Sequence, residues 1–182
     1  MIVLGLDPGT RHFGWGVVAR EGTRLKHLGH GVIDTDTKGP FAGRLVEIER
    51  ALLEVLRVHA PEEASMESLF FAKDAQAAAK LGHARGVAML VCARDEMAVA
   101  EYPPARVKRT IAGNGRAEKT QVAQMIRVLL GLTVLPALDA SDALAVAVTH
   151  LQASQVLRAA MPEMPARQGR RARFNYRKAP SV

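Results

Sequence analysis

The first 34 residues constrain the fold most, because they contain three stretches rich in Val, Ile, Leu and Gly that short turns separate. The stretches cover 2–7, 13–20 and 24–34, and the turns contain the sequences DPGT and EGTR. Turns this short join neighbouring antiparallel strands, so the segment predicts a three-stranded meander. The fold therefore begins with an antiparallel sheet.

After Pro40 the spacing of apolar residues becomes helical, because Leu45, Ile48, Leu52 and Leu56 recur at intervals of three or four. Further along, strand and helix patterns alternate. They comprise a strand in EASMESLFF (63–71), an Ala-rich helix (74–96), a strand in MAVAEYP (97–103) and helices over 103–111, 117–130 and 138–157. A meander extended by strands that follow helical crossovers is typical of RNase H-like domains. We therefore predict an α/β, RNase H-like fold with a mixed five-stranded sheet flanked by helices.

The length of 182 residues and the 48% hydrophobic content suit a single core. We expect one domain over 1–157 and a flexible basic tail over 158–182. The net charge of +7 is concentrated at the end, since 167–182 carry six Arg and Lys residues and no acid. Such a run suits binding to nucleic-acid phosphates, but solvated chain ends have the same composition. The sequence leaves both interpretations open.

Neither a secretory leader nor a membrane span is expected. The apolar run 2–6 is too short and has no basic leader, and no later segment approaches about 20 uninterrupted apolar residues. Cys92 is the only cysteine, which excludes an intrachain disulfide and a paired Cys/His zinc site. These features predict a cytoplasmic protein.

Asp7 ends the first apolar run, directly before a Pro-Gly-Thr turn. An aspartate there binds a nucleotide phosphate, holds a metal ion or caps the turn. Actin-like ATPases and sugar kinases share this turn but need a second one, and Asp7–Gly9 is the only Asp-x-Gly triplet in the chain. The sequence GNGRAEKT also fails as a Walker loop, because Glu118 stands where that loop needs Gly. We therefore discard ATP binding.

A metal site needs further carboxylates. Glu67 lies in the middle of a predicted strand, where an acid is costly unless it is paired or binds a cation, although an exposed edge strand also accommodates one. Asp139 and Asp142 share one face at the start of a predicted helix, where an N-cap followed by an acid in the first turn is equally favourable. An RNase H-like fold would bring these three carboxylates and Asp7 to one end of the sheet. They would repel one another and raise their pKa values unless Mg²⁺ or Mn²⁺ were bound.

Two such ions, about 3.5–4 Å apart, form the usual clamp for in-line attack on a phosphodiester.

A basic stretch is predicted on the same face of the fold as this metal site. It is interpreted either as a patch that binds DNA phosphates or as a solvated helix face. It contains six basic residues against the single acid Glu118, namely Arg106, Lys108, Arg109, Arg116, Lys119 and Arg127.

Four blocks of the sequence, GLDPGTRHFGWGVV, ESLFFAKDAQAAAKLGHARGVA, EYPPARVKRTIAGNGRAEKTQV and LDASDALAVAVTH, resemble in order and spacing the RuvC family of bacterial Holliday-junction resolvases. The similarity covers roughly residues 1–155. It implies a homodimeric, Mg²⁺-dependent endonuclease that acts in DNA recombination and repair by cutting two opposed strands of a four-way junction, leaving 5′-phosphate ends. It also implies the RuvA–RuvB branch-migration complex as a partner.

Residue by residue, the resemblance implies that four carboxylates are the catalytic metal ligands: Asp7, Glu67, Asp139 and Asp142. Lys108 and Lys119 match the family's basic residues near the cut strand, and Phe70 matches an aromatic residue that contacts unpaired bases. Ser68 departs from the Gln expected after Glu67. Two alternatives stay open, namely an RNase H-like nuclease for another nucleic acid and a junction-binding protein without catalysis. The intact carboxylate set argues against the second.

The long Ala-rich helix carries a small-residue face, because Ala78, Gly82, Gly86 and Leu90 recur every four positions. Each glycine inside a helix costs about 0.5–1 kcal/mol relative to alanine, so something should approach closely there. The helix either packs tightly on its own sheet or faces a twofold mate. The second interpretation predicts a dimer with two related active sites.

Overall fold

The computed structural model describes residues 1–68 and 74–160, in which five strands and five helices form one mixed sheet with a helical layer on each face. Phe70 and residues 161–182 of the predicted tail fall outside these residues, and so does the tail-binding hypothesis, whereas residues 158–160 continue the last helix. In chain order the elements are β1 (Ile2–Asp7), β2 (His12–Glu21), β3 (Arg24–Asp34), α1 (Phe41–His59), β4 (Glu63–Glu67), α2 (Ala75–Arg94), β5 (Val99–Tyr102), α3 (Pro104–Ala112), α4 (Lys119–Leu129) and α5 (Leu138–Ala160).

The sheet has the strand order β3-β2-β1-β4-β5, which confirms the predicted meander and its extension. The first three strands pair antiparallel. Strand β4 pairs parallel with β1, and β5 pairs parallel with β4. Parallel strands place their carboxyl ends at one edge of a sheet, and β1 and β4 end at Asp7 and Glu67. The topology alone therefore brings these two acids to the same end.

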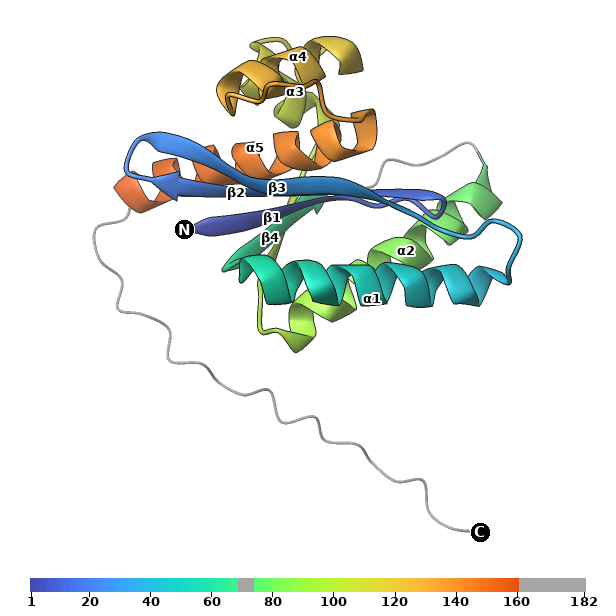
Figure 1. Ribbon diagram of the computed structural model, residues 1–182. Helices are drawn as coiled ribbons and strands as arrows, with labels where there is room; N and C mark the ends of the chain where they lie inside the picture. Colours follow the sequence, from blue (N-terminus) through green and yellow to red (C-terminus); the bar gives the residue numbers. More distant parts are fainter. Residues whose placement is uncertain (69–73, 161–182) are drawn as a thin grey trace.

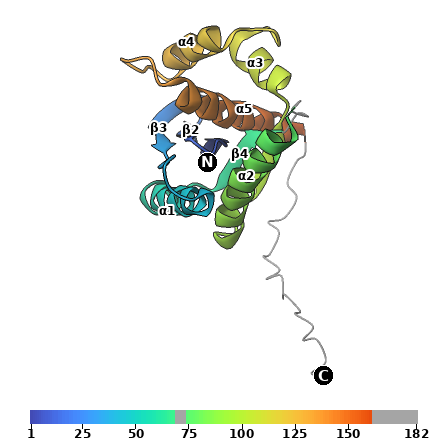
Figure 2. The ribbon, with the colours of Figure 1, turned by 90° about the vertical axis from the view of Figure 1, so that its right-hand side faces the viewer.

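The helices form two layers, as Figures 1 and 2 show. Helices α1 and α2 cover one face, where Leu6 and Met66 of the sheet pack with Ile48 and Leu52 of α1. Helix α5 crosses the other face, and α3 and α4 pack outside it. The end of the sheet that carries the two acids therefore lies between α2 on one side and the start of α5 on the other.

Helix α5 lies unusually close to the sheet because glycines face it. A Cβ atom at Gly5 would collide with the carbonyl oxygen of Ala143, and one at Gly14 would collide with that of Asp139. Gly14 is also the register partner of Asp7 across β1 and β2. The missing side chain at Gly14 thus allows the first turn of α5 to lie beside the end of β1.

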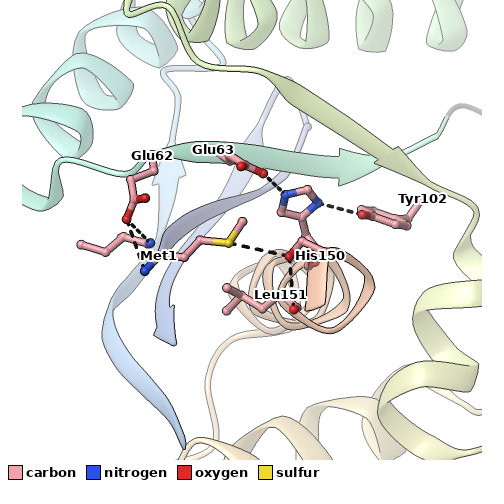
Figure 3. Close-up of polar contacts among 8 residues, drawn as sticks. Met1, Glu62, Glu63, Tyr102, His150 and Leu151 are labelled. Carbon is pink, nitrogen blue, oxygen red and sulfur yellow. Dashed lines mark hydrogen bonds and ion pairs between the residues drawn. The ribbon is translucent and has the colours of Figure 1, made fainter. Parts of the chain in front are cut away.

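Further along α5, a buried polar network joins this helix to β4 and β5 (Figure 3). His150 Nε2 lies 2.6 Å from Glu63 Oε2, and its Nδ1 lies 2.7 Å from the hydroxyl of Tyr102. Because a carboxylate only accepts, Nε2–H donates to Glu63, and Nδ1 accepts from the tyrosine. Both ring nitrogens are therefore satisfied, as a buried histidine requires.

One local prediction was wrong, and one alternative left open by the sequence is excluded. The strand predicted over 63–71 ends at Glu67, which is its final residue and not its middle. Helix α5 begins at Leu138, so Asp139 lies inside the first turn instead of capping it, and Ser141 N already donates to Ala137 O. Both differences place the acids at element ends, where side chains reach beyond the sheet.

None of the helices within residues 1–68 and 74–160 has the length and apolar character that a membrane span requires.

Candidate active site

Four carboxylates meet at the end of the sheet where β1, β4 and α5 come together, and we call them the acidic quartet: Asp7, Glu67, Asp139 and Asp142. Asp7 and Glu67 end neighbouring parallel strands, while Asp139 and Asp142 lie in the first turns of α5. Their charges act on one another, since Asp142, Glu67 and Asp139 all raise the pKa of Asp7. The structure thus brings all four sequence-predicted acids into one electrostatic unit.

Burial and crowding hold Asp7 far from its ordinary ionisation. Desolvation is the largest cause and Asp142 the next, and together with the other acids they raise the pKa of Asp7 from about 3.8 to about 7. Desolvation, followed by Asp142, also raises the pKa of Glu67. A carboxyl group that is buried beside like charges resists ionisation until a cation compensates it.

Lys119, at the start of α4, supplies a positive charge to the quartet. Its Nζ lies 2.5 Å from Asp142 Oδ2, and its charge lowers the pKa of both Asp7 and Glu67. Burial opposes the charge on Lys119, but the hydrogen bond and the attraction to Asp142 raise its pKa on balance. The ammonium group thus stands where a cation is electrostatically favoured.

The quartet suits a hard divalent cation by its chemistry. All its donors are carboxylate oxygens, which Mg²⁺ and Mn²⁺ prefer, and the buried Asp7 is costly to ionise without a positive partner. In residues 1–68 and 74–160, no three carboxylate, imidazole or thiol groups already converge closely enough to hold one ion. The donor set therefore fits a metal, although the four side chains are not arranged as a closed ligand cage.

A cleft of about 240 Å³ opens beside two members of the quartet. Asp7 and Glu67 line it together with Ser68, Arg85 and Pro104. Sequence reasoning missed Arg85, although one signal was available. The signal is that Arg85 is the single arginine on an otherwise apolar stripe of the helix, which contains Ala84 and Ala88. A charge at such a position requires a buried partner.

The predicted basic residues differ in their distance from the quartet. Lys108 is half-buried, and its charge lowers the pKa of Glu67, so it lies near the site. Arg109 and Arg116 are exposed on and after α3. Arg106 stacks on Tyr102, with its guanidinium carbon 5.1 Å from the ring centre. Lys108 and Lys119 thus flank the acids, and the exposed arginines extend the positive charge outward.

The glycines of α2 do not pack on their own sheet, so that interpretation of the small-residue face was wrong. A Cβ at Gly82 or Gly86 would meet no atom within 4 Å. Both glycines line an apolar groove of about 510 Å³ between α2 and α1, together with Leu45, Val87 and Leu90. The groove faces outward, and Leu90 is 48% exposed.

The sequence model of the family described as crossover junction endodeoxyribonuclease RuvC matches residues 3–150. The chain belongs to the RuvC family. RuvC of Sorangium cellulosum is 61% identical over 154 residues, which are 85% of this chain and 86% of that protein. RuvC of Thermus thermophilus in complex with a Holliday junction substrate has a TM-score of 0.81 and 37% identity, covering 86% of this chain and 96% of that one.

A more distant structure confirms the fold. The yeast mitochondrial Holliday junction resolvase Ydc2 has a TM-score of 0.63 at 14% identity, covering 86% of this chain and 80% of its own. The predicted α/β, RNase H-like architecture is therefore confirmed, and so is the resemblance to the RuvC family.

Proposed function

We propose that this RuvC-family chain resolves four-way DNA junctions by paired nicks in opposed strands, with the acidic quartet as its metal-binding active site. The family is one of metal-dependent endonucleases that cut crossover junctions. The observation that carries the assignment of the site is the state of Asp7. It is a half-buried carboxyl group whose pKa desolvation and three neighbouring acids raise to about 7, against the opposing charge of Lys119. Such an arrangement is costly for stability and is typical of a functional site.

We infer that Mg²⁺, which Mn²⁺ would replace, is held by the carboxylates of Asp7, Glu67, Asp139 and Asp142, with two ions at each site. When bound, the metal would activate a water molecule and stabilise the charge on the phosphate and on the leaving 3′-oxygen. Asp7 would lose its proton on cation binding, because a positive charge beside the carboxylate offsets the desolvation and the like charges that raise its pKa. Lys119 would exchange its contact with Asp142 for a phosphate of the cut strand.

The positive groups beside the quartet would hold the DNA backbone. Lys108 and Lys119 lie next to the acids, and Arg109 and Arg116 are exposed on and after α3. Each would neutralise phosphate charge and so contribute a salt-dependent, sequence-independent part of the affinity. We assign Phe70 to contact with unpaired bases at the crossover, from the family resemblance alone.

A second copy of the chain would occupy the apolar groove between α1 and α2. Its glycines leave room for the close approach of another backbone, and a twofold pair would use the same surface on both copies. Two cuts in opposed strands require two related sites, which such a pair provides. We also infer that the RuvA–RuvB branch-migration complex delivers the junction.

One assay tests the central proposal. A synthetic mobile junction incubated with the full chain and Mg²⁺ should give paired nicks that ligase reseals, whereas linear duplex and RNA–DNA hybrid should stay intact. Preferential cutting of the hybrid would instead indicate an RNase H-like nuclease for another substrate. Binding to the junction without any cutting would indicate a non-catalytic junction-binding protein.

The dimer has its own test in Leu90→Glu, which places a charge in the groove. We expect sedimentation equilibrium to show a folded monomer for this variant and a dimer for the parent chain at micromolar concentration. Val128→Glu is the control, because Val128 is 66% exposed on α4, away from the groove. A parent chain that stays monomeric yet cuts both strands of a cruciform together would contradict the proposal.

A further inference from the structure

Arg85 is a buried arginine that connects helix α2 to the ends of two strands. Its side chain is 7% exposed, and its Nη1 donates to the backbone carbonyl of Glu67 at 2.5 Å. Its Nη2 lies 2.6 Å from Glu101 Oε2 on β5. One guanidinium group therefore contacts the last residue of β4 and a side chain of its neighbour.

We propose that Arg85 is a positioning residue that fixes the carboxylate of Glu67 for metal binding. The proposal rests on the proposed function of the acidic quartet. Within residues 1–68 and 74–160, Arg85 bonds to the main chain of Glu67 and to the side chain of Glu101, and to no carboxylate of the quartet. Its role is thus to hold a ligand in place.

The end of β4 needs such support. The pairing of β1 with β4 ends at Leu6 and Met66, one residue before Glu67. On the other side, the last bond between β4 and β5 joins Ser68 N to Tyr102 O at 2.9 Å. Arg85 thus bonds the carbonyl of the first residue beyond the β1 pairing. Without it, Glu67 would be held from the β5 side alone.

The chemistry of the contact favours arginine over lysine. A guanidinium group is planar and offers several N–H donors in a fixed arrangement, so it reaches a carbonyl and a carboxylate together. The ammonium group of lysine is a single point with a shorter reach to two separate partners. Glu101 compensates the positive charge, which would otherwise lie uncompensated beside a cation site.

A purely electrostatic role for Arg85 predicts the opposite result from a positioning role. Loss of a positive charge near the quartet would strengthen cation binding by reducing repulsion. Loss of the support for Glu67 would weaken cation binding, because a ligand that is no longer oriented binds metal about 10–100-fold less well. The sign of the change in Mn²⁺ affinity therefore separates the two roles.

The experiment uses the full chain with Arg85→Gln and Arg85→Lys. Mn²⁺ binding is measured by calorimetry without DNA, junction affinity in Ca²⁺, and single-turnover cutting in Mg²⁺. Positioning predicts about 10–100-fold weaker Mn²⁺ binding and slower cutting in Arg85→Gln, and a smaller loss of both in Arg85→Lys. Junction affinity should stay within about twofold, since the phosphate-binding groups are intact.

Arg94→Gln is the matched control, because Arg94 also lies on α2 and pairs with Glu49 of α1 at 2.8 Å. It should leave all three measurements unchanged. Arg85→Lys keeps charge and bulk, so it remains informative if Arg85→Gln does not fold. Tighter or unchanged Mn²⁺ binding in a folded Arg85 variant would overturn the proposal, as would a loss of junction affinity that matches the loss of cutting. A parent chain that binds Mn²⁺ but cuts no junction would instead contradict the proposed function.

Discussion

The middle and the start of α5 bury polar groups in opposite ways. Near its middle, His150 is buried with a partner on each ring nitrogen, Glu63 on one side and Tyr102 on the other. At its start, Asp139 and Asp142 face Asp7, whose pKa burial and like charges raise to about 7. A satisfied network stabilises the fold, whereas a crowd of like charges opposes it. We therefore propose stability as the role of the middle of α5 and ligand binding as the role of its start.

The strongest test of this division is Asp7→Asn. We expect it to reduce junction cutting at least about a thousandfold, because a metal ligand is lost, and to leave junction binding nearly unchanged. The same change should stabilise the metal-free protein at pH 8 by at least about 1 kcal/mol, the equivalent of one pKa unit of relieved strain. Cutting in Mg²⁺ and chemical denaturation in EDTA measure the two effects. Normal cutting would remove Asp7 from the active site.

Lys119→Met should have the next largest effect. The substitution removes an ammonium group that contacts Asp142 and whose charge lowers the pKa of Asp7. It also removes a proposed contact to the cut strand. We expect cutting to fall about 100-fold and the slope of log affinity against log salt to decrease by about 0.9. Lys26→Met is the control, since Lys26 forms a surface ion pair with Glu21 on β2. Equal losses in both variants would point to a general charge effect.

Without metal, the pH dependence of protein stability should reveal the raised pKa of Asp7. Unfolded chains release the Asp7 proton near pH 3.8 and the folded protein near pH 7, so between these values the folded state binds more protons. The contribution of Asp7 to stability is therefore full below about pH 4 and is lost as the pH rises through 7.

Melting temperatures in EDTA should accordingly fall between pH 5 and pH 8, and less steeply in Asp7→Asn. The stabilisation by Mg²⁺ should grow over the same range, because protons compete with the metal for Asp7. A melting temperature that rises with pH equally in both proteins would show that Asp7 does not titrate as described.

The smallest effect on cutting is expected at the satisfied network in the middle of α5. Tyr102→Phe leaves Nδ1 of His150 without its donor and should cost about 1–2 kcal/mol of stability. Cutting per folded molecule should stay unchanged, since the hydroxyl group points toward His150. Denaturant titration and single-turnover cutting at a temperature well below the transition check this. Slower cutting at equal folded fraction would mean that the middle and the start of α5 are coupled.

The sequence allowed prediction wherever one local pattern decides the structure. The three first strands follow from apolar runs and short turns, and α1 follows from the helical spacing after Pro40. The meeting of Asp7 and Glu67 follows from the strand order, because parallel strands end at the same edge, and that of Asp139 and Asp142 with them was expected from the RNase H-like fold. Each of these inferences needs only neighbouring residues and a general rule of topology.

Features that depend on three-dimensional contact were not predictable in the same way. The partners of Arg85 are 18 and 16 positions away, and no spacing rule connects a helix residue to a strand end. The face of Gly82 and Gly86 was ambiguous, because glycine spacing alone does not say whether a sheet or open space lies opposite. The end of β4 at Glu67 was missed because the apolar residues after it continue a strand-like pattern.

The contact between α5 and the sheet also has a consequence for how this sequence can vary. At Gly5 and Gly14, main chain lies against main chain, so the separation of Asp139 from Asp7 is set by atoms that every amino acid shares. A single added methyl group at Gly14 would force the helix outward. Inherited variation is therefore restricted most at two positions without side chains, which preserve the geometry of the site.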